Sequence, residues 1–338
     1  MTKKNLNKLA MFILLGNAFL SSCATTPSGE TLNSTVSIKQ IQPFDKQIKN
    51  NALTINSNET LAIASNSDES QVRVYDLTNK KLIHKLTYVT PRHLQFAADG
   101  NSFYISDSSL GIIQQVSTID FSIIHQAYVG QGAFGFTLNK DYLLINNEAQ
   151  NTVTVINLAN WKIERVLNGF QEPRQGIKFG PDNRYVYVTN FKSDDVRVID
   201  TRIWQIVKTL TGILGVRAIA ISPDESLLYG ASSATNSLRV IKISNNQLLK
   251  TLPTGNDPYG ASLSKDGDTL ITGNKIDGTV EIFSTKNYQL LKVISGFNEP
   301  RQAILYSKSL GKIYVLQKDM SIGVVNYLQK QPQIEVIN

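Results

Sequence analysis

The sequence predicts an all-β fold, a seven-bladed β-propeller built from four-stranded antiparallel blades. Three observations lead to this prediction. Short runs of residues alternate with the two-residue period of a β-strand. Turns rich in Pro, Asp, Asn and Gly separate the runs. The whole pattern recurs with a nearly fixed period of about 42 residues, which is typical of a propeller blade.

The period is clearest when it is counted between equivalent residues, each the last residue of the second strand in its unit. These marker residues are Asn66, Asp107, Asn147, Asn190, Ser232, Asn274 and Gln317. The steps between them are 41, 40, 43, 42, 42 and 43 residues, so seven units follow one another. A solenoid could share the period, but it does not need four strands in every repeat.

The fourth unit shows all the parts. A first strand leads into the turn GPDN at 180–183, and the second strand, YVYVTN, ends at the marker Asn190. A polar turn follows, and then come the β-branched run at 196–200 and a fourth strand, QIVKTL, at 205–210. An isolated hairpin of this kind is only marginally stable, so the units are expected to fold together as one ring.

These residues carry a family resemblance. YVTN at 187–190, preceded by GPDN and followed by V-x-V-I-D-T at 196–201, resembles the YVTN β-propeller repeat family. The chain is similar to periplasmic YncE-like propellers and to archaeal surface proteins, and the weaker units extend the resemblance over about 52–327. The resemblance implies the fold but little about function, because one fold hosts many activities.

The amino terminus reads as an export signal. Residues 1–22 combine three lysines with an apolar run at 9–20 that is too short for a good transmembrane helix. The run ends in Leu20-Ser21-Ser22-Cys23, which resembles the lipobox of bacterial lipoproteins. An ordinary signal peptide with a chance cysteine is the alternative.

The resemblance to a lipobox implies that Cys23 carries lipid, including palmitate, and anchors the protein to a membrane. Residues 23–35 would then be a flexible tether, and 36–338 the propeller domain. Ala24 after the cysteine favours the outer membrane in the Gram-negative sorting rule that this segment resembles. The sequence leaves open whether the domain faces the periplasm or the cell surface, and what its oligomeric state is.

Composition narrows the function. The formal net charge is +7, but loss of the three signal lysines leaves 31 Lys+Arg against 27 Asp+Glu, a mild excess that does not by itself argue for nucleic acid. Cys23 is the only cysteine, so the fold contains no internal disulfide and depends on its core.

Two segments compete to close the ring as the outer strand of the last blade: VSIKQI at 36–41 and QIEVI at 333–337.

Motifs for metal or cofactor chemistry are not visible. The sequence has no C-x-x-C-H, no H-E-x-x-H and no G-x-S-x-G, and its three histidines are far apart. The G-x-G-x-x-G match at 130–135 is followed by a strand rather than a helix, so it is interpreted as an inter-blade loop. We expect no cofactor, no metal and no catalytic residues.

The most informative pattern is at the entry to each innermost strand. Aligning the units places seven residues around one mouth of the central channel: Asn51, Arg92, Phe134, Gln175, Arg217, Tyr259 and Gln302. The preceding position adds Arg174 and Arg301, and the following one is Gly or Ala in six of seven units, with His93 as the exception. The predicted ligand-binding residues are Arg92, His93, Arg174, Gln175, Arg217, Tyr259, Arg301 and Gln302.

Two loops at this mouth are near copies, GFQEPRQ at 169–175 and GFNEPRQ at 296–302. One interpretation is repeat ancestry, with Glu172 and Glu299 paired locally to Arg174 and Arg301. The other is a cationic mouth for an anionic or sugar-like ligand, because the arginine fork binds carboxylate or phosphate in bidentate fashion.

Three functions follow. The favoured one is a non-enzymatic envelope lipoprotein, a binding or scaffold propeller for a protein or an anionic envelope ligand. The second is a lactonase-type hydrolase, which the fold resembles, with His93, Glu172 and Glu299 as acid–base candidates. The third, implied by the YncE-like resemblance, is single-stranded nucleic-acid binding by arginines and stacking aromatics.

Overall fold

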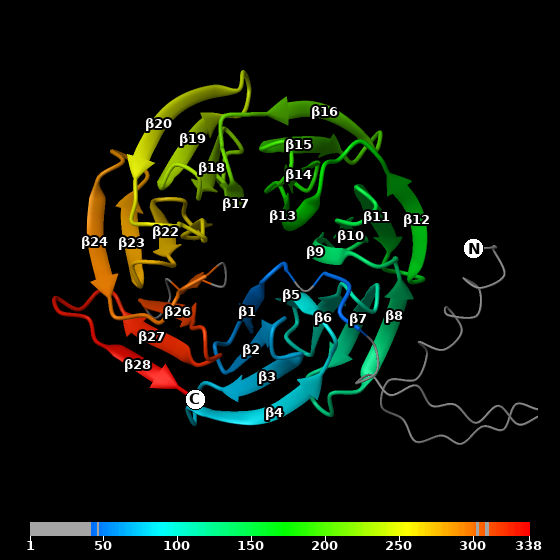
Figure 1. The fold of residues 1–338 in the computed structure, drawn as a ribbon, viewed down its shortest axis with the longest axis horizontal. Coiled ribbons are helices and arrows are strands. Elements are labelled where there is room, and N and C mark those ends of the chain that lie inside the picture. The colour runs from blue at the N-terminus through cyan, green and yellow to red at the C-terminus, as the bar shows by residue number, and fades with distance from the viewer. Residues whose placement is uncertain (1–41, 46, 302–303, 308–310) are drawn as a thin grey trace, which may run out of the picture.

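A computed structural model describes residues 42–45, 47–301, 304–307 and 311–338 of the chain. Its strands form seven four-stranded antiparallel sheets, which follow one another around a ring (Figure 1). Within each sheet the strands lie in chain order, from the axis outwards. The predicted seven-bladed propeller is therefore confirmed.

The first two strands of each blade lie nearest the axis. The first strands are β1 (Asn51–Ile55), β5 (Pro91–Phe96), β9 (Ala133–Leu138), β13 (Pro173–Phe179), β17 (Val216–Ile221), β21 (Ser262–Leu263) and β25 (Ile304–Ser307). The second strands are β2 (Leu61–Asn66), β6 (Ser102–Asp107), β10 (Tyr142–Asn147), β14 (Tyr185–Asn190), β18 (Leu227–Ser232), β22 (Thr269–Asn274) and β26 (Lys312–Leu316).

The third and fourth strands complete each blade towards the rim. The third strands are β3 (Gln71–Asp76), β7 (Ile112–Ser117), β11 (Thr152–Asn157), β15 (Asp195–Asp200), β19 (Ser237–Lys242), β23 (Thr279–Ser284) and β27 (Ile322–Asn326). The fourth strands are β4 (Lys81–Thr87), β8 (Ile123–Tyr128), β12 (Lys162–Leu167), β16 (Gln205–Leu210), β20 (Gln247–Pro253), β24 (Leu290–Ser295) and β28 (Ile334–Ile337).

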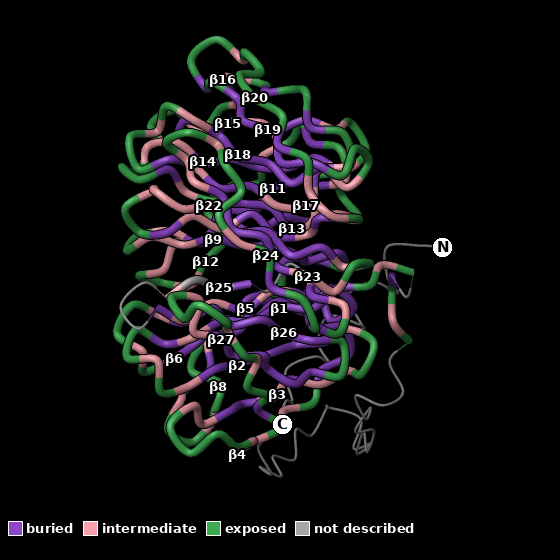
Figure 2. Tube along the Cα trace, turned by 90° about the vertical axis from the view of Figure 1, so that its left-hand side faces the viewer, coloured by how far each residue is buried: buried purple, intermediate pink, exposed green. Residues whose placement is uncertain are grey.

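Burial decreases from the middle of each blade to its rim. In β14 every residue after the first is buried, because both faces of this strand pack against neighbouring blades. In β4 exposed and half-buried residues alternate, because one face of this edge strand meets water. Figure 2 shows the same trend, with buried residues through the middle of the blades and exposed ones in the turns and outer strands.

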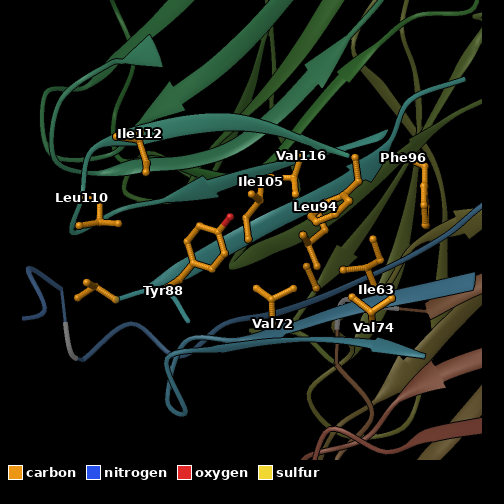
Figure 3. Close-up of a cluster of buried hydrophobic side chains, with 13 residues drawn as sticks. Ile63, Val72, Val74, Tyr88, Leu94, Phe96, Ile105, Leu110, Ile112 and Val116 are labelled. Atoms are coloured by element: carbon orange, nitrogen blue, oxygen red, sulfur yellow. The ribbon is translucent and has the colours of Figure 1, made fainter. Parts of the chain in front are cut away.

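The described residues contain seven hydrophobic clusters, and each lies between two adjacent blades. Figure 3 shows the cluster between the first two blades, where Ile63, Val72 and Val74 face Leu94, Ile105 and Ile112. A propeller has no single central core, so burial between blades is what holds the ring together.

The carboxyl-terminal segment closes the ring. β28 pairs with β27 as the outer strand of the seventh blade, which resolves the competition in favour of the segment at 333–337. The last blade packs on the first through Tyr314, Leu316 and Ile337, which meet Leu53 and Tyr75. Hydrogen bonds reinforce the contact: Tyr314 donates to Glu59 Oε2 at 2.9 Å, and the Tyr75 hydroxyl donates to the Met320 carbonyl.

Small residues are needed where the innermost strands crowd the axis. A Cβ on Gly135 would come within 2.2 Å of the Gln175 carbonyl oxygen in the next blade. One on Gly176 would come within 2.4 Å of Thr189 Oγ1. Both contacts are shorter than van der Waals packing allows, which explains why these two positions are glycine.

Several predictions lie outside the described residues: the signal at 1–22, Cys23 with the tether at 23–35, the strand at 36–41 and the side chain of Gln302. In the part of the chain that the structure describes, no helix is long and apolar enough to cross a membrane.

Candidate functional site

The mouth of the channel is partly covered by the segment that precedes β1. We call the described residues 42–45 and 47–50 the strap. The Phe44 amide donates to Ser109 Oγ at 2.8 Å, and the Asn50 amide donates to Ser67 Oγ at 3.1 Å. The strap is therefore bound to the second blade at one end and to the first blade at the other.

Arg92 is the centre of this attachment. Its side chain is 0% exposed and lies 2.5 Å from the carboxylate of Asp45, which is 2% exposed. The guanidinium also donates to Ser108 Oγ at 2.9 Å and to the Ile48 carbonyl at 2.7 Å. Burial lowers the pKa of Arg92, and Asp45 opposes that shift, so the group stays cationic. Arg92 was predicted to bind a ligand, but in the structure it binds the strap.

The open part of the mouth is a small pocket of about 30 Å³. Arg174, Gln175, Arg217 and Tyr259 line it, as predicted from the alignment of the units. Asn50 and other strap residues form part of its wall.

Cations and aromatic rings alternate in a row, and all its members except Lys275 line the pocket. The Arg174 guanidinium lies 3.8 Å from the ring centroid of Phe191, and that of Arg217 lies 5.3 Å from the same ring. Arg217 is also 4.8 Å from the Tyr259 ring, with Lys275 at 5.7 Å from Tyr259. We call these five residues the cation–aromatic column. Each cation in it is attracted by the quadrupole of a ring.

The two copied loops make the same local ion pair. Arg174 donates to Glu172 at 3.1 Å, and Arg301 donates to Glu299 at 3.2 Å. Both glutamates have positive φ, 49° and 47°, so the loops share a backbone shape as well as a sequence. The local pairing that the sequence suggested is therefore present. Arg174 lines the pocket, whereas Arg301 is not among its lining residues.

His93 lies near the strap, in contact with Gln175 rather than with the pocket. Gln175 Nε2 hydrogen-bonds His93 Nδ1, and Gln175 Oε1 accepts from Asn50 Nδ2 at 3.1 Å. The ring also meets Phe136 edge-on, with centroids 4.8 Å apart. Burial, helped by the positive charge of Lys178, lowers the pKa of His93 to about 4. The imidazole is therefore neutral at pH 7.

Acidic groups near the pocket are mostly engaged. Lys318 Nζ lies 2.5 Å from Glu299, and together with Arg301 it lowers the pKa of that carboxyl. Burial raises the pKa of Glu148, against the opposing effect of Arg174. Among the described residues, no group of three or more His, Cys, Asp or Glu is placed to hold a metal ion.

Phe191 and the strap are not among the residues that the sequence pattern predicts for the mouth. A signal for Phe191 was present, because it directly follows the marker Asn190. The residues in this position are Ser67, Ser108, Glu148, Phe191, Ser233, Lys275 and Lys318. At least five of them contact the entry of an innermost strand or the strap, for example Ser233 Oγ, which accepts from Arg217 Nε at 3.0 Å. Nothing in the repeat pattern indicated the strap, since it precedes the first unit.

Comparison with known proteins agrees with the propeller fold. A family described as "YNCE-like beta-propeller" matches residues 131–249, which confirms the resemblance over that stretch. No curated protein matches the chain. A solved structure, hydrazine synthase of Kuenenia stuttgartiensis, is similar at 15% sequence identity and a TM-score of 0.71, covering 88% of this chain and 98% of that one. At so low an identity the likeness shows the fold alone.

Proposed function

We propose that the protein is a non-enzymatic binding or scaffold propeller that holds an anionic ligand, or an anionic group of a protein, at the mouth of its channel. One observation carries the proposal: Arg174 and Arg217 lie over the same ring, Phe191, at the wall of the mouth pocket. A guanidinium held over a ring loses little further freedom when it binds, and its planar fork of N–H donors suits an oxyanion.

The contacts at the mouth support binding over acid–base catalysis. A general base works best when its pKa is near the working pH, but that of His93 is about 4. Glu299 is engaged by two cations, and Glu172 by Arg174. The three acid–base candidates of the lactonase hypothesis are therefore poorly suited to the task.

We further propose that the protein acts as an envelope lipoprotein, anchored to the outer membrane through Cys23. The lipobox-like Leu20–Cys23 segment supports this. A membrane anchor would keep the propeller close to envelope polymers and envelope proteins, which is where an anion-binding mouth would find its ligand.

A binding screen tests the function. Anionic sugars, peptidoglycan fragments and oligonucleotides are titrated against the wild type, the Arg174→Ala/Arg217→Ala variant and Arg165→Ala. Arg165 is the matched control, because it also lies over an aromatic ring, Trp204 at 5.9 Å, but on the outer strand β12. We expect ligands to lose affinity for the double variant only. Equal binding to all three proteins would place the ligand elsewhere.

A further inference from the structure

The aromatic rings of the mouth are already in contact with cations. Phe191 has the Arg174 guanidinium at 3.8 Å and that of Arg217 at 5.3 Å, and Tyr259 has Arg217 at 4.8 Å and Lys275 at 5.7 Å. A ligand ring that stacked on a face of Phe191 or Tyr259 that a cation occupies would have to displace that cation. Recognition by base stacking needs accessible ring faces, so the column is poorly suited to it.

The size of the pocket limits what enters it. A cavity needs a volume of about 10–15 Å³ to hold one water molecule. The mouth pocket is therefore small, at about 30 Å³, but it is open to solvent on one side. The oxygens of one carboxylate or one phosphate fit this space, and the rest of a larger ligand can remain in the opening.

The donors at the pocket match an oxyanion. Arg174 and Arg217 bring two guanidinium groups to one wall, and each carries five N–H donors in a planar fork. Glu172 accepts from Arg174 on one side, so the site is a partly neutralised cationic wall rather than a bare positive patch.

We propose that the mouth pocket captures a single terminal oxyanion, a carboxylate or a phosphate monoester, at the edges of the Arg174 and Arg217 guanidinium groups, while the rest of the ligand stays outside. This rests on the proposed function and names its ligand class. Phe191 is a positioning residue, because it orients both guanidinium groups.

Titration of the full chain with small probes at low salt tests the proposal. Inorganic phosphate and acetate distinguish the two oxyanions, and dimethyl phosphate represents an internal diester. We expect phosphate, acetate or both to bind more tightly than dimethyl phosphate. Phe191→Leu should weaken that binding by about 2- to 30-fold, the range that a lost cation–π contact implies, although it removes no charge. Arg165→Ala should bind as the wild type does.

Two further measurements keep the result clear. Arg217→Lys retains the positive charge but lacks the guanidinium fork, so it should bind the probes more weakly than the wild type does. This measurement remains informative even if Phe191→Leu is poorly folded. A short thymidine oligomer with a 5′-phosphate should bind more tightly than the same oligomer without it. Equal binding of the two oligomers together with no tighter binding of acetate than of dimethyl phosphate would overturn the inference. Probe binding that Phe191→Leu and Arg217→Lys both leave unchanged would overturn it as well. In that case, the ligand from the screen could still bind the wild type more tightly than the Arg174→Ala/Arg217→Ala variant. The proposed binding function would then stand without this inference.

Discussion

The carboxylate of Asp45 lies 2.5 Å from the guanidinium of Arg92, and both side chains are almost fully buried. Asp45 comes from the strap and Arg92 from β5, so the pair fixes the strap across the channel mouth. An uncompensated buried charge is costly, and each group therefore needs the other. The pair thereby holds the strap, whose residues Ile48, Lys49 and Asn50 form part of the pocket wall.

Removal of one partner of this pair should destabilise the protein strongly. We expect Asp45→Ala to cost about 3–5 kcal/mol, because it leaves Arg92 buried and unpaired. Thermal or denaturant unfolding measures the loss. Lys49→Ala is the control: its ion pair with Asp68 joins side chains that are 56% and 38% exposed, so its loss should change the stability by less than about 1 kcal/mol.

The single variants Asp45→Asn and Arg92→Met and the double variant Asp45→Asn/Arg92→Met form a cycle for the same pair. We expect the double variant to lose clearly less than the sum of these two single losses, because neither charge is left alone. Additive losses would show that the two side chains stabilise the fold independently.

Stability should fall as the pH is lowered through the range in which His93 titrates. Its folded pKa is about 4, below the ordinary value near 6.5, so the unfolded chain binds a proton more readily. The stability that the neutral imidazole contributes is complete above about pH 6.5 and is lost progressively towards pH 4. At pH 5 the loss should be about 2 kcal/mol relative to pH 7.

Unfolding by denaturant at pH 7 and pH 5 checks this, with His93→Gln as the comparison. The variant has no group to protonate at this position, so its stability should fall less over the same interval. An identical fall in both proteins would assign the pH dependence to other groups.

Removal of residues 334–338 should open the ring. The truncation deletes β28, including Ile337, which is 3% exposed, and uncovers the cluster between the last and first blades. Burial of one such side chain contributes about 1.5–3 kcal/mol, so we expect the melting temperature to fall by several degrees. The same measurement on a chain without 36–41 compares the two candidate closing segments. An unchanged melting temperature in the 334–338 truncation would contradict closure by β28.

The two copied loops should differ in their effect on binding. Arg174 lines the pocket and Arg301 does not, although both pair with a neighbouring glutamate. For the tightest ligand of the screen, Arg174→Ala should therefore cost about 1.5–3 kcal/mol of binding free energy, the range for a charged hydrogen bond. Arg301→Ala should cost less. Calorimetry on the two variants measures the difference, and a larger loss in Arg301→Ala would move the site towards the seventh blade.

Acylation of Cys23 stays a prediction, and metabolic labelling tests it. Palmitate label should enter the wild-type protein and be absent from Cys23→Ala, because this is the only cysteine in the chain. Equal labelling of both proteins would contradict the lipid anchor.

The fold could be predicted from the sequence almost in full. The spacing of the marker residues, from Asn66 to Gln317, gave seven units, and the strand alternation gave four strands in each. Local patterns suffice here, because each blade repeats one short arrangement of strands and turns. The alignment also placed Arg174, Gln175, Arg217 and Tyr259 at one mouth, since equivalent positions in a closed ring share a level on the axis.

The sequence by itself determined the number of blades and the place of Arg174, Gln175, Arg217 and Tyr259 at one mouth. Only the tertiary structure decided which of the predicted mouth residues face the pocket, which segment closes the ring, and that Arg92 is occupied by Asp45. The physical reason is that these outcomes depend on contacts between segments far apart in the chain, such as Asp45 with Arg92 and Tyr314 with Glu59. A periodic pattern specifies the conformation within a unit, whereas charge pairing and side-chain packing between units depend on three-dimensional distances that the period does not contain.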